Sequence, residues 1–355
     1  MRQHVPQTRV FYCDPPGRSD PESLFSQGPR EHESNYILFH DQEPIHLDVH
    51  APLFNEVMIR NLDLNNDYGP RHRGIVTSEF DSEAVAQICD RYDWHQYYYF
   101  YHGWAAMDWY RGYDKSFLMP PPDQRTITRS FISPNRIVGG KREHRLQLMY
   151  HLLLGGVENA HISFPRVCPV ENVDVCDLVH DMSELYPDIV EKFQHAKLPW
   201  NFSGENNHPM TSCWLDLFEQ SSESLAYVVT ETVYRGRRKH LTEKVFKPIC
   251  LRMPFVLVST AGSLEYLRSY GFQTFDTVWD ESYDLETDDD LRINKIADLL
   301  LEFDRMTPQQ LKILHEKCRQ IVEYNYQHFY GGGFEKILWH ELDVMLKTIK
   351  RDFQR

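Results

Sequence analysis

Short apolar runs that alternate with helical patterns are the feature that most restricts how this chain can fold. Four runs in the first third have the length and composition of strands: Val10–Cys13, Tyr36–His40, Gly74–Ser78 and Tyr97–His102. Between the last two, Asp81–Tyr92 has helical spacing, and Ser82 is suited to cap that helix. Strands that alternate with helices indicate a parallel α/β fold.

The strongest break in this pattern is the run Pro120-Pro121-Pro122, because proline has no backbone N–H and restricts the residue before it to extended conformations. With 355 residues the chain is long enough for two domains. We therefore place a linker at the prolines and expect an N-terminal α/β domain, 1–122, and a C-terminal α/β domain, 123–355. The second domain has predicted strands and helices of its own: strands Thr126–Ile132, His161–Phe164, Leu225–Thr230 and Pro254–Ser259, and helices Arg142–Leu154 and Ser263–Tyr270.

The end of the chain has the spacing of three helices. Asp288–Asp290 favours the N-terminus of the first, Thr307-Pro308 that of the second, and Gly331–Gly333 separates the second from the third. The three aspartates are superficially similar to a D-x-D metal site, but no strand precedes them and they have an evident capping role. We expect them to be structural, and we expect no metal ion.

The composition is that of a folded globular protein, with 41% hydrophobic and 25% charged residues. The formal net charge of −14 disfavours a protein that coats nucleic acid regardless of sequence, although it allows a local basic groove. Seven scattered cysteines without a C-x-x-C pair indicate a reducing compartment rather than a disulfide framework or a zinc knuckle. No apolar run approaches the roughly 18 residues that cross a bilayer, so we expect a cytoplasmic protein without a membrane partner.

The segment from Thr230 to Lys244 is the most informative for chemistry. A strand precedes the basic loop Arg235–His240, and Thr242-Glu243-Lys244 then begins a helix. The unpaired N–H groups and the dipole of a helix N-terminus, together with Lys244, would bind a diphosphate, and Glu243 would bind ribose hydroxyls. The alternative is a capped surface helix beside a solvated basic loop. The signatures of P-loop kinases, simple dehydrogenases, zincins and α/β-hydrolases are absent.

A family resemblance favours the diphosphate interpretation. The sequence resembles the nucleotide-sugar domain of α-1,3-fucosyltransferase-like enzymes in five stretches: Leu241-Thr-Glu-Lys-Val-Phe-Lys-Pro, Pro254-Phe-Val-Leu-Val, Gly262-Ser-Leu-Glu-Tyr-Leu, Gly271-Phe-Gln-Thr-Phe and Asp280-Glu-Ser-Tyr-Asp284. It is still more similar to glycosyltransferases that are common in tailed-phage genomes. The resemblance implies a GT-B-like fold, with two Rossmann-like domains facing a central cleft and a helical C-terminus. It also implies metal-independent, inverting transfer of a sugar from a nucleoside diphosphate sugar to an acceptor hydroxyl.

The resemblance further implies which cations bind the donor. Family members carry an arginine at the start of the first helix of the second domain, directed at the diphosphate. The matching residue is Arg145, with Arg142 as the alternative. Arg237 or Arg238 in the basic loop would add positive charge. A helix-surface cation is the competing interpretation of Arg145.

The general base of the family is a carboxylate in a turn that follows a strand of the first domain. The corresponding turn is His40-Asp41-Gln42-Glu43-Pro44, so the resemblance implies Glu43, or else Asp41, as the base. These side chains would otherwise only satisfy backbone amides of the turn. Glu79, after the next predicted strand, is a reserve candidate.

Residues Tyr92–Tyr113 are dense in aromatic side chains, which stack on sugar rings and on bases. The polar and aromatic residues that follow the predicted strand are candidates for contacts with the acceptor: His102, Trp104, Asp108 and Arg111. An ordinary aromatic core is the competing interpretation.

The acceptor is left open between a hydroxylated base in phage DNA and a glycan, with protein side chains as a further possibility. A phage enzyme would act in the host cytoplasm. Two other classes of function compete with an enzyme. One is a non-catalytic module that binds a nucleotide or a glycan, and the other is a structural protein of the virion.

Overall fold

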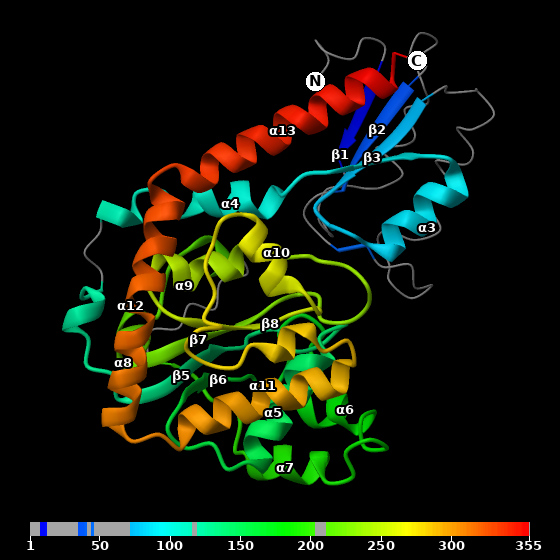
Figure 1. The fold of residues 1–355 in the computed structure, drawn as a ribbon. Helices are drawn as coiled ribbons and strands as arrows, with labels where there is room; N and C mark the ends of the chain where they lie inside the picture. The colour runs from blue at the N-terminus through cyan, green and yellow to red at the C-terminus, as the bar shows by residue number, and fades with distance from the viewer. Residues whose placement is uncertain are drawn as a thin grey trace. The chain divides into compact units, whose positions relative to one another are not determined.

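The computed structural model describes residues 8–12, 35–40, 44–45, 72–115, 119–202 and 211–354. Within them, the strands form two four-stranded sheets, and neighbouring strands run parallel in both. Helices surround the sheets and make up the C-terminal part of the chain (Figure 1). The predicted α/β class with parallel sheets and a helical C-terminus is therefore confirmed.

The bounds of the elements follow the predicted alternation of strands and helices. The strands are β1 (Thr8–Tyr12), β2 (Asn35–His40), β3 (His72–Thr77), β4 (His95–Tyr98), β5 (Arg129–Pro134), β6 (His161–Ser163), β7 (Ser224–Thr230) and β8 (Phe255–Val258). The α-helices are α3 (Glu83–Tyr92), α4 (Tyr101–Trp109), α5 (Glu143–Leu154), α6 (Val175–His180), α7 (Ile189–His195), α8 (Phe218–Glu223), α9 (Phe246–Cys250), α10 (Ser263–Ser269), α11 (Asp289–Asp304), α12 (Pro308–Tyr330) and α13 (Gly333–Asp352).

Contacts along the chain divide it into two compact units. The first comprises Met1–Ala105, Gly236–His240 and Glu335–Arg355, and the second comprises Ala106–Arg235 and Leu241–Phe334. This division differs from the expected domains 1–122 and 123–355, because the last helix and part of the basic loop group with the first unit.

One face of the first sheet, which has the order β1-β2-β3-β4, packs against α3. Tyr36 and Leu38 of β2 share a buried cluster with Val85 and Ile88 of α3. Successive side chains of a strand point to opposite faces, so these two residues define one side of the sheet. Ser82 caps α3 by accepting a hydrogen bond from the Val85 amide, which confirms the predicted cap.

The opposite face of this sheet packs against the last helix of the chain. Ile37 and Phe39, which alternate with the residues facing α3, share a second cluster with Met345 and Ile349 of α13. A Glu341 carboxylate oxygen also accepts a hydrogen bond from the Phe100 amide, at 2.7 Å. The apolar face of α13 is therefore buried on a sheet that lies far away in the sequence.

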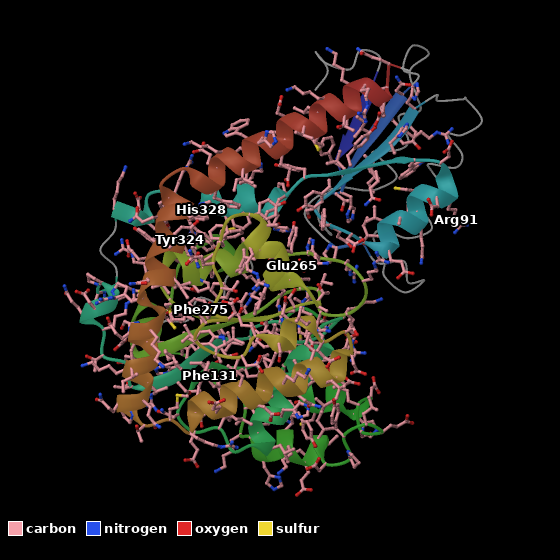
Figure 2. The ribbon with its side chains drawn as sticks, viewed as in Figure 1. Arg91, Phe131, Glu265, Phe275, Tyr324 and His328 are labelled. Carbon is pink, nitrogen blue, oxygen red and sulfur yellow. The ribbon has the colours of Figure 1, made fainter. Side chains whose placement is uncertain are left out.

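The second unit contains the sheet of order β6-β5-β7-β8. Helix α11 packs on α5 and on β5, and α12 packs on β7 and α9. Figure 1 shows α11 and α5 side by side beneath this sheet. Phe131 of β5 and Phe275 are fully buried inside the unit (Figure 2), where Phe275 stacks on Trp279 at 4.7 Å.

The caps of the C-terminal helices confirm the predicted starts. The Asp288 side chain accepts hydrogen bonds from two amides at the start of α11, so the aspartate run caps a helix as expected. Thr307 and Gln310 form a capping box at the start of α12, with Pro308 in the first turn.

The predicted strand Tyr97–His102 is wrong in its second half. Strand β4 ends at Tyr98, and α4 begins at Tyr101. Phe100 and Tyr110, both within the aromatic segment Tyr92–Tyr113, are fully buried, as the core interpretation requires.

Among the described residues, no helix is both long and apolar enough to span a membrane.

Candidate functional site

The sheet of the second unit has a topological switch point between β5 and β7. Strand β5 comes first in the sequence, the chain adds β6 on one side of it, and β7 follows on the other side. Ligands of open parallel sheets bind at the carboxyl ends of the strands where the order reverses in this way. At this place the Thr230 hydroxyl donates to the Asn135 side-chain oxygen at 2.9 Å, which joins the ends of the two strands.

Glu231, the residue that follows β7, holds the segment around Thr242 at this switch point. Its side chain is fully buried. Its carboxylate accepts hydrogen bonds from the Thr242 amide, at 3.1 Å, and from the Thr242 hydroxyl, at 2.6 Å. Glu231 is not among the residues predicted from the sequence, although an acidic residue directly after an apolar strand is a signal for such a role.

Thr242 and Lys244 lie together at the start of a short 3₁₀ helix, η5 (Glu243–Val245). Thr242 caps this helix as predicted, because its hydroxyl oxygen accepts from the Lys244 amide. The Lys244 ammonium donates to the hydroxyls of Thr242, at 3.0 Å, and Thr232, at 3.2 Å. Its nearest carboxylate oxygen, on the buried Glu243, lies 3.7 Å away, and the Lys244 side chain is 30% exposed. The ammonium is thus both positioned and accessible.

The helix that begins here is short. After η5, helix α9 ends at Cys250, two residues beyond Pro248. Proline removes a backbone donor, and of the helical residues that follow Thr242 only the five of α9 are α-helical. The predicted contribution of a helix dipole is therefore small, and the charge at this place comes mainly from side chains.

Arg145, on α5, lies at the same switch point, but its terminal nitrogens bond to the protein itself. They donate to the backbone oxygens of Ile137, at 2.7 Å, and Thr230, at 2.9 Å. The side chain is 6% exposed, and its Nε is buried without a hydrogen-bond partner. Arg145 is therefore not the helix-surface cation of the competing interpretation. Arg142, immediately before α5, donates to the Gly139 oxygen at 3.3 Å.

The electrostatics of this region favour an anion. Burial lowers the pKa of His144 well below its usual range, and the neighbouring Arg145 and Arg142 lower it further. Burial and the repulsion from Arg142 also lower the pKa of Arg145 to about 9. Burial is the largest cause of both shifts, and the charge of a neighbouring arginine is the second. A negatively charged ligand would be attracted to this end of the sheet.

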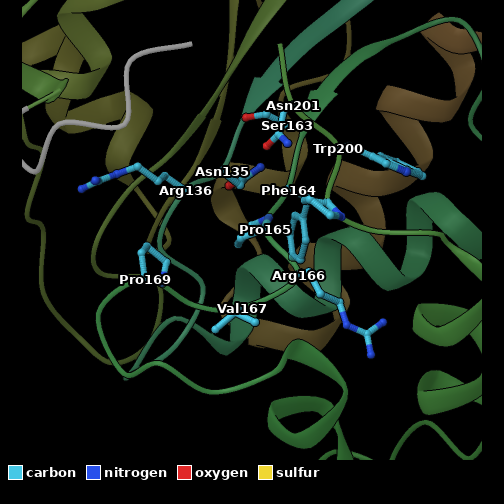
Figure 3. A pocket seen from close by; sticks show the side chains of 11 residues that line it. Asn135, Arg136, Ser163, Phe164, Pro165, Arg166, Val167, Pro169, Trp200 and Asn201 are labelled. Atoms are coloured by element: carbon cyan, nitrogen blue, oxygen red, sulfur yellow. The ribbon is translucent and has the colours of Figure 1, made fainter. Parts of the chain in front are cut away.

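A pocket of about 360 Å³ opens beside the switch point, at the carboxyl ends of β5 and β6 (Figure 3). Asn135, which is bonded to Thr230, is also part of its wall, so this residue links the pocket to the end of β7. In Figure 3 Asn135, Ser163 and Asn201 gather above Phe164 and Pro165. The volume lies in the range of pockets that hold small organic ligands, about 300–1,000 Å³.

The two loop arginines predicted to bind the donor are engaged within the first unit. Arg238 donates to the Ile45 oxygen at 2.7 Å and lies 3.5 Å from the Glu79 carboxylate. Arg237 pairs with Asp81 at 3.3 Å, and both side chains are exposed. Arg238 is therefore held by contacts within the protein. The basic loop is also not the fully solvated loop of the alternative interpretation.

The reserve base Glu79 is a buried structural carboxylate. It is fully buried and accepts hydrogen bonds from the Ile45 amide and from the Ser82 hydroxyl. Burial raises its pKa, and Arg238 opposes that rise. Asp41 and Glu43, the two residues expected to act as base, lie outside the described residues.

The four predicted acceptor residues are on or next to α4, where they make contacts within the protein. His102 is buried, with its ring 5.1 Å from that of His240, and Trp104 packs edge-to-face on Trp339 at 4.7 Å. Asp108 and Arg111 are exposed and pair with each other at 3.1 Å. In the parts of the chain that the structure describes, no group of three or more His, Cys, Asp or Glu side chains forms a metal site.

No protein-family model and no curated protein matches this chain. The solved structures that are similar to it include two crystal structures of glucosyltransferases. One is a crystal structure of the DNA-modifying enzyme β-glucosyltransferase in the presence and absence of uridine diphosphoglucose, with a TM-score of 0.44, 9% identity, and coverage of 98% of this chain and 81% of that chain. The other is a crystal structure of T4 phage BGT in complex with its UDP-glucose substrate, with a TM-score of 0.43, 9% identity, and coverage of 98% and 82%. A likeness at this level carries no argument about activity.

Proposed function

We propose that this protein is a glycosyltransferase of the GT-B kind, which transfers a sugar from a nucleoside diphosphate sugar to an acceptor hydroxyl. The observation that carries the proposal is the position of Lys244. Its ammonium is partly exposed at the switch point of a parallel sheet, and two threonine hydroxyls hold it there. Arg142 and Arg145, at the start of α5, add positive charge at the end of the sheet where such folds bind phosphorylated ligands.

The chemistry requires that the leaving diphosphate be stabilised as it gains negative charge. Lys244 and Arg142 are the side chains that we assign to this role, without a metal ion. Arg145 and Glu231 act as positioning residues, because they hold the ends of β5 and β7 and the Thr242 segment in one arrangement. Glu243 is proposed to bind the ribose hydroxyls.

The acceptor side of the reaction follows the family resemblance. Glu43, or else Asp41, takes the proton of the acceptor hydroxyl while that oxygen attacks the anomeric carbon. The bond from this carbon to the diphosphate breaks as the new glycosidic bond forms, so the configuration inverts. A hydroxylated base in phage DNA and a glycan are the acceptors to test. His102, Trp104, Asp108 and Arg111 remain the proposed acceptor contacts.

Calorimetry with the UDP, GDP and dTDP forms of glucose tests the proposal directly, with a CMP-sugar as a comparison that offers a single phosphate. We expect at least one of the diphosphate sugars to bind. Lys244→Ala should weaken that binding about tenfold or more, whereas Lys312→Ala, at an exposed lysine of α12, should leave it unchanged.

Two results would contradict the proposal. One is that no nucleotide sugar binds at millimolar concentration. The other is that Lys244→Ala and Lys312→Ala bind the donor equally well. Binding without release of nucleoside diphosphate, in the presence of either acceptor, would favour a non-catalytic module instead.

A further inference from the structure

Residues 166–175, which follow β6, form a short hairpin. Val167 and Asp174 pair through an antiparallel backbone bridge, and the Arg166 side chain donates to the Asp174 carboxylate at 2.7 Å. The first residues of the hairpin border the pocket beside β5 and β6, and Figure 3 shows Val167 on its wall. The bridge and the ion pair hold the two arms of the hairpin together, so the fold fixes the position of its tip, which carries Glu171.

Glu171 reaches from this tip onto the turn between β5 and α5. A Cβ atom added to Gly139 would lie 2.5 Å from Glu171 Oε2, which is too close for any side chain. The Cys168 thiol donates to the same oxygen at 2.5 Å, and the Gly139 amide donates to the Cys168 sulfur at 3.4 Å. The carboxylate therefore covers the backbone of the turn, and glycine at position 139 leaves the room that it needs.

Arg142 borders the same turn. A Cβ atom added to Gly140 would lie 3.2 Å from Glu171 Oε1 and 3.3 Å from a terminal nitrogen of Arg142, so both side chains reach the space above Gly140. Arg142 is the N-cap residue of α5, and its side chain makes no capping hydrogen bond. The amides of a helix N-terminus and an arginine beside them attract an anion. Glu171 is an anionic group that the fold already places there.

The contacts that hold Glu171 on the turn are weak. A thiol is a weak hydrogen-bond donor, so the bond from Cys168 adds little. Glu171 is an exposed residue, and rotation of its side chain would move the carboxylate into water without a change in the hairpin backbone. A ligand that offers more negative charge to Arg142 than one carboxylate does would therefore displace it.

We propose that Glu171 is an internal competitor of the donor. Its carboxylate occupies the place of a phosphate beside Gly139 and Arg142, and the diphosphate of the donor displaces it. The proposal rests on the proposed function, in which Arg142 stabilises the diphosphate. It adds a control of affinity, because Glu171 lowers the affinity of the site for every anion and excludes singly charged anions more than a diphosphate.

Two substitutions at Glu171 separate its charge from its position. Glu171→Gln removes the charge and keeps the length of the side chain. Glu171→Asp keeps the charge but is one methylene shorter, so its carboxylate withdraws from Gly139. Glu184→Gln is the matched control, because Glu184 is also exposed and lies outside the hairpin. Exposed positions tolerate these changes, and equal melting temperatures of all variants would confirm that they are folded.

The experiment is a calorimetric titration of each variant with inorganic pyrophosphate and with UDP, GDP, CDP and dTDP. We expect Glu171→Gln to bind pyrophosphate about tenfold more tightly than the wild type does. Glu171→Asp should bind it more tightly by about threefold or more, and Glu184→Gln should bind it as the wild type does. The nucleotide that binds the wild type best should follow the same order.

The other outcomes overturn the proposal in distinguishable ways. If Glu171→Gln gains affinity but Glu171→Asp does not, the carboxylate acts through its charge alone and does not occupy the place of a phosphate. If Glu171→Gln binds pyrophosphate as the wild type does, or more weakly, Glu171 does not compete with an anion. The proposed function is then unaffected, provided that the wild type binds a nucleotide. If neither the wild type nor Glu171→Gln binds any of these probes, this proposal and the proposed function both fail.

Discussion

Arg238 and Lys244 come from one short stretch of the chain, but their surroundings are opposite. Arg238 belongs to the first unit, its side chain is 15% exposed, and it faces the fully buried carboxylate of Glu79. Lys244 belongs to the second unit and is 30% exposed, and its ammonium lies 3.7 Å from the buried Glu243 carboxylate and donates to two threonine hydroxyls. The sequence presents both as cations of one basic segment.

The difference shows which property makes a cation available to a ligand. The charge of Arg238 is balanced by Glu79 in a buried pair, where removing either partner leaves the other without compensation. Lys244 also has a carboxylate partner, Glu243, but its side chain is 30% exposed, against 15% for that of Arg238. Burial and the partner, rather than the residue type, separate a structural cation from a binding one.

Breaking the buried pair should have the largest effect. Arg238→Ala should lower the free energy of unfolding by about 3–5 kcal/mol, because Glu79 stays buried without its cation. Urea unfolding measures this change. The double variant Glu79→Gln with Arg238→Met should recover most of the loss, since it removes both charges and keeps a side-chain oxygen that accepts from the Ile45 amide or the Ser82 hydroxyl. A loss no greater than that of Lys244→Ala would contradict the comparison.

Removing the exposed cation should affect catalysis instead of stability. We expect Lys244→Ala to reduce the turnover number with a nucleoside diphosphate sugar by about 10²–10³-fold, the cost typical of losing one group that stabilises developing negative charge. Release of nucleoside diphosphate in a steady-state assay measures the turnover. Lys312→Ala is the control, and its turnover should equal that of the wild type. Normal turnover in Lys244→Ala would show that this ammonium does not contact the leaving group.

Glu231→Gln tests how Lys244 is held. The amide and the hydroxyl of Thr242 both donate to Glu231, and a glutamine would direct its own N–H₂ at one of these donors. We expect a loss of about 1–3 kcal/mol in unfolding free energy and a higher KM for the donor. Glu265→Gln, at an exposed position of α10, should change neither quantity. A variant that loses stability but keeps its KM would restrict Glu231 to a structural role.

The sequence predicts the local parts of this comparison but not the long-range ones. Thr242 as a cap and the α5 position of Arg145 follow from patterns within a few residues. The partners Glu79 for Arg238 and Glu231 for Thr242 come from other elements, and only the folded sheets bring them near. The placement of α13 on the first sheet has the same origin, because its apolar face predicts burial without saying on which surface.

Lowering the pH should reduce the defect of Arg238→Ala. Burial raises the pKa of Glu79 above its ordinary value of 4.5, and Arg238 opposes this. The carboxyl therefore binds a proton more tightly in the folded chain than in the unfolded one, so its contribution to stability rises as the pH falls through the folded pKa. Without Arg238 the folded pKa is higher still, and the variant should regain up to about 1.4 kcal/mol per pH unit relative to the wild type. Urea midpoints measured between the folded pKa of the wild type and the higher folded pKa of the variant show the effect. The double variant Glu79→Gln with Arg238→Ala should not show it.

Arg237 should give the smallest effect, although the sequence places it in the same basic loop. Its pair with Asp81 is exposed on both sides, and pairs of this kind contribute about 0–1 kcal/mol because solvent screens them. Arg237→Ala should therefore change the unfolding free energy by less than about 1 kcal/mol and leave the affinity for the donor unaltered. Calorimetric titration with the nucleotide sugar that binds the wild type measures the second quantity. If the affinity for the donor fell as far as in Lys244→Ala, the basic loop Arg235–His240 would be part of the donor site. The contrast would then hold for the residues Arg238 and Lys244, but not for the loop as a whole.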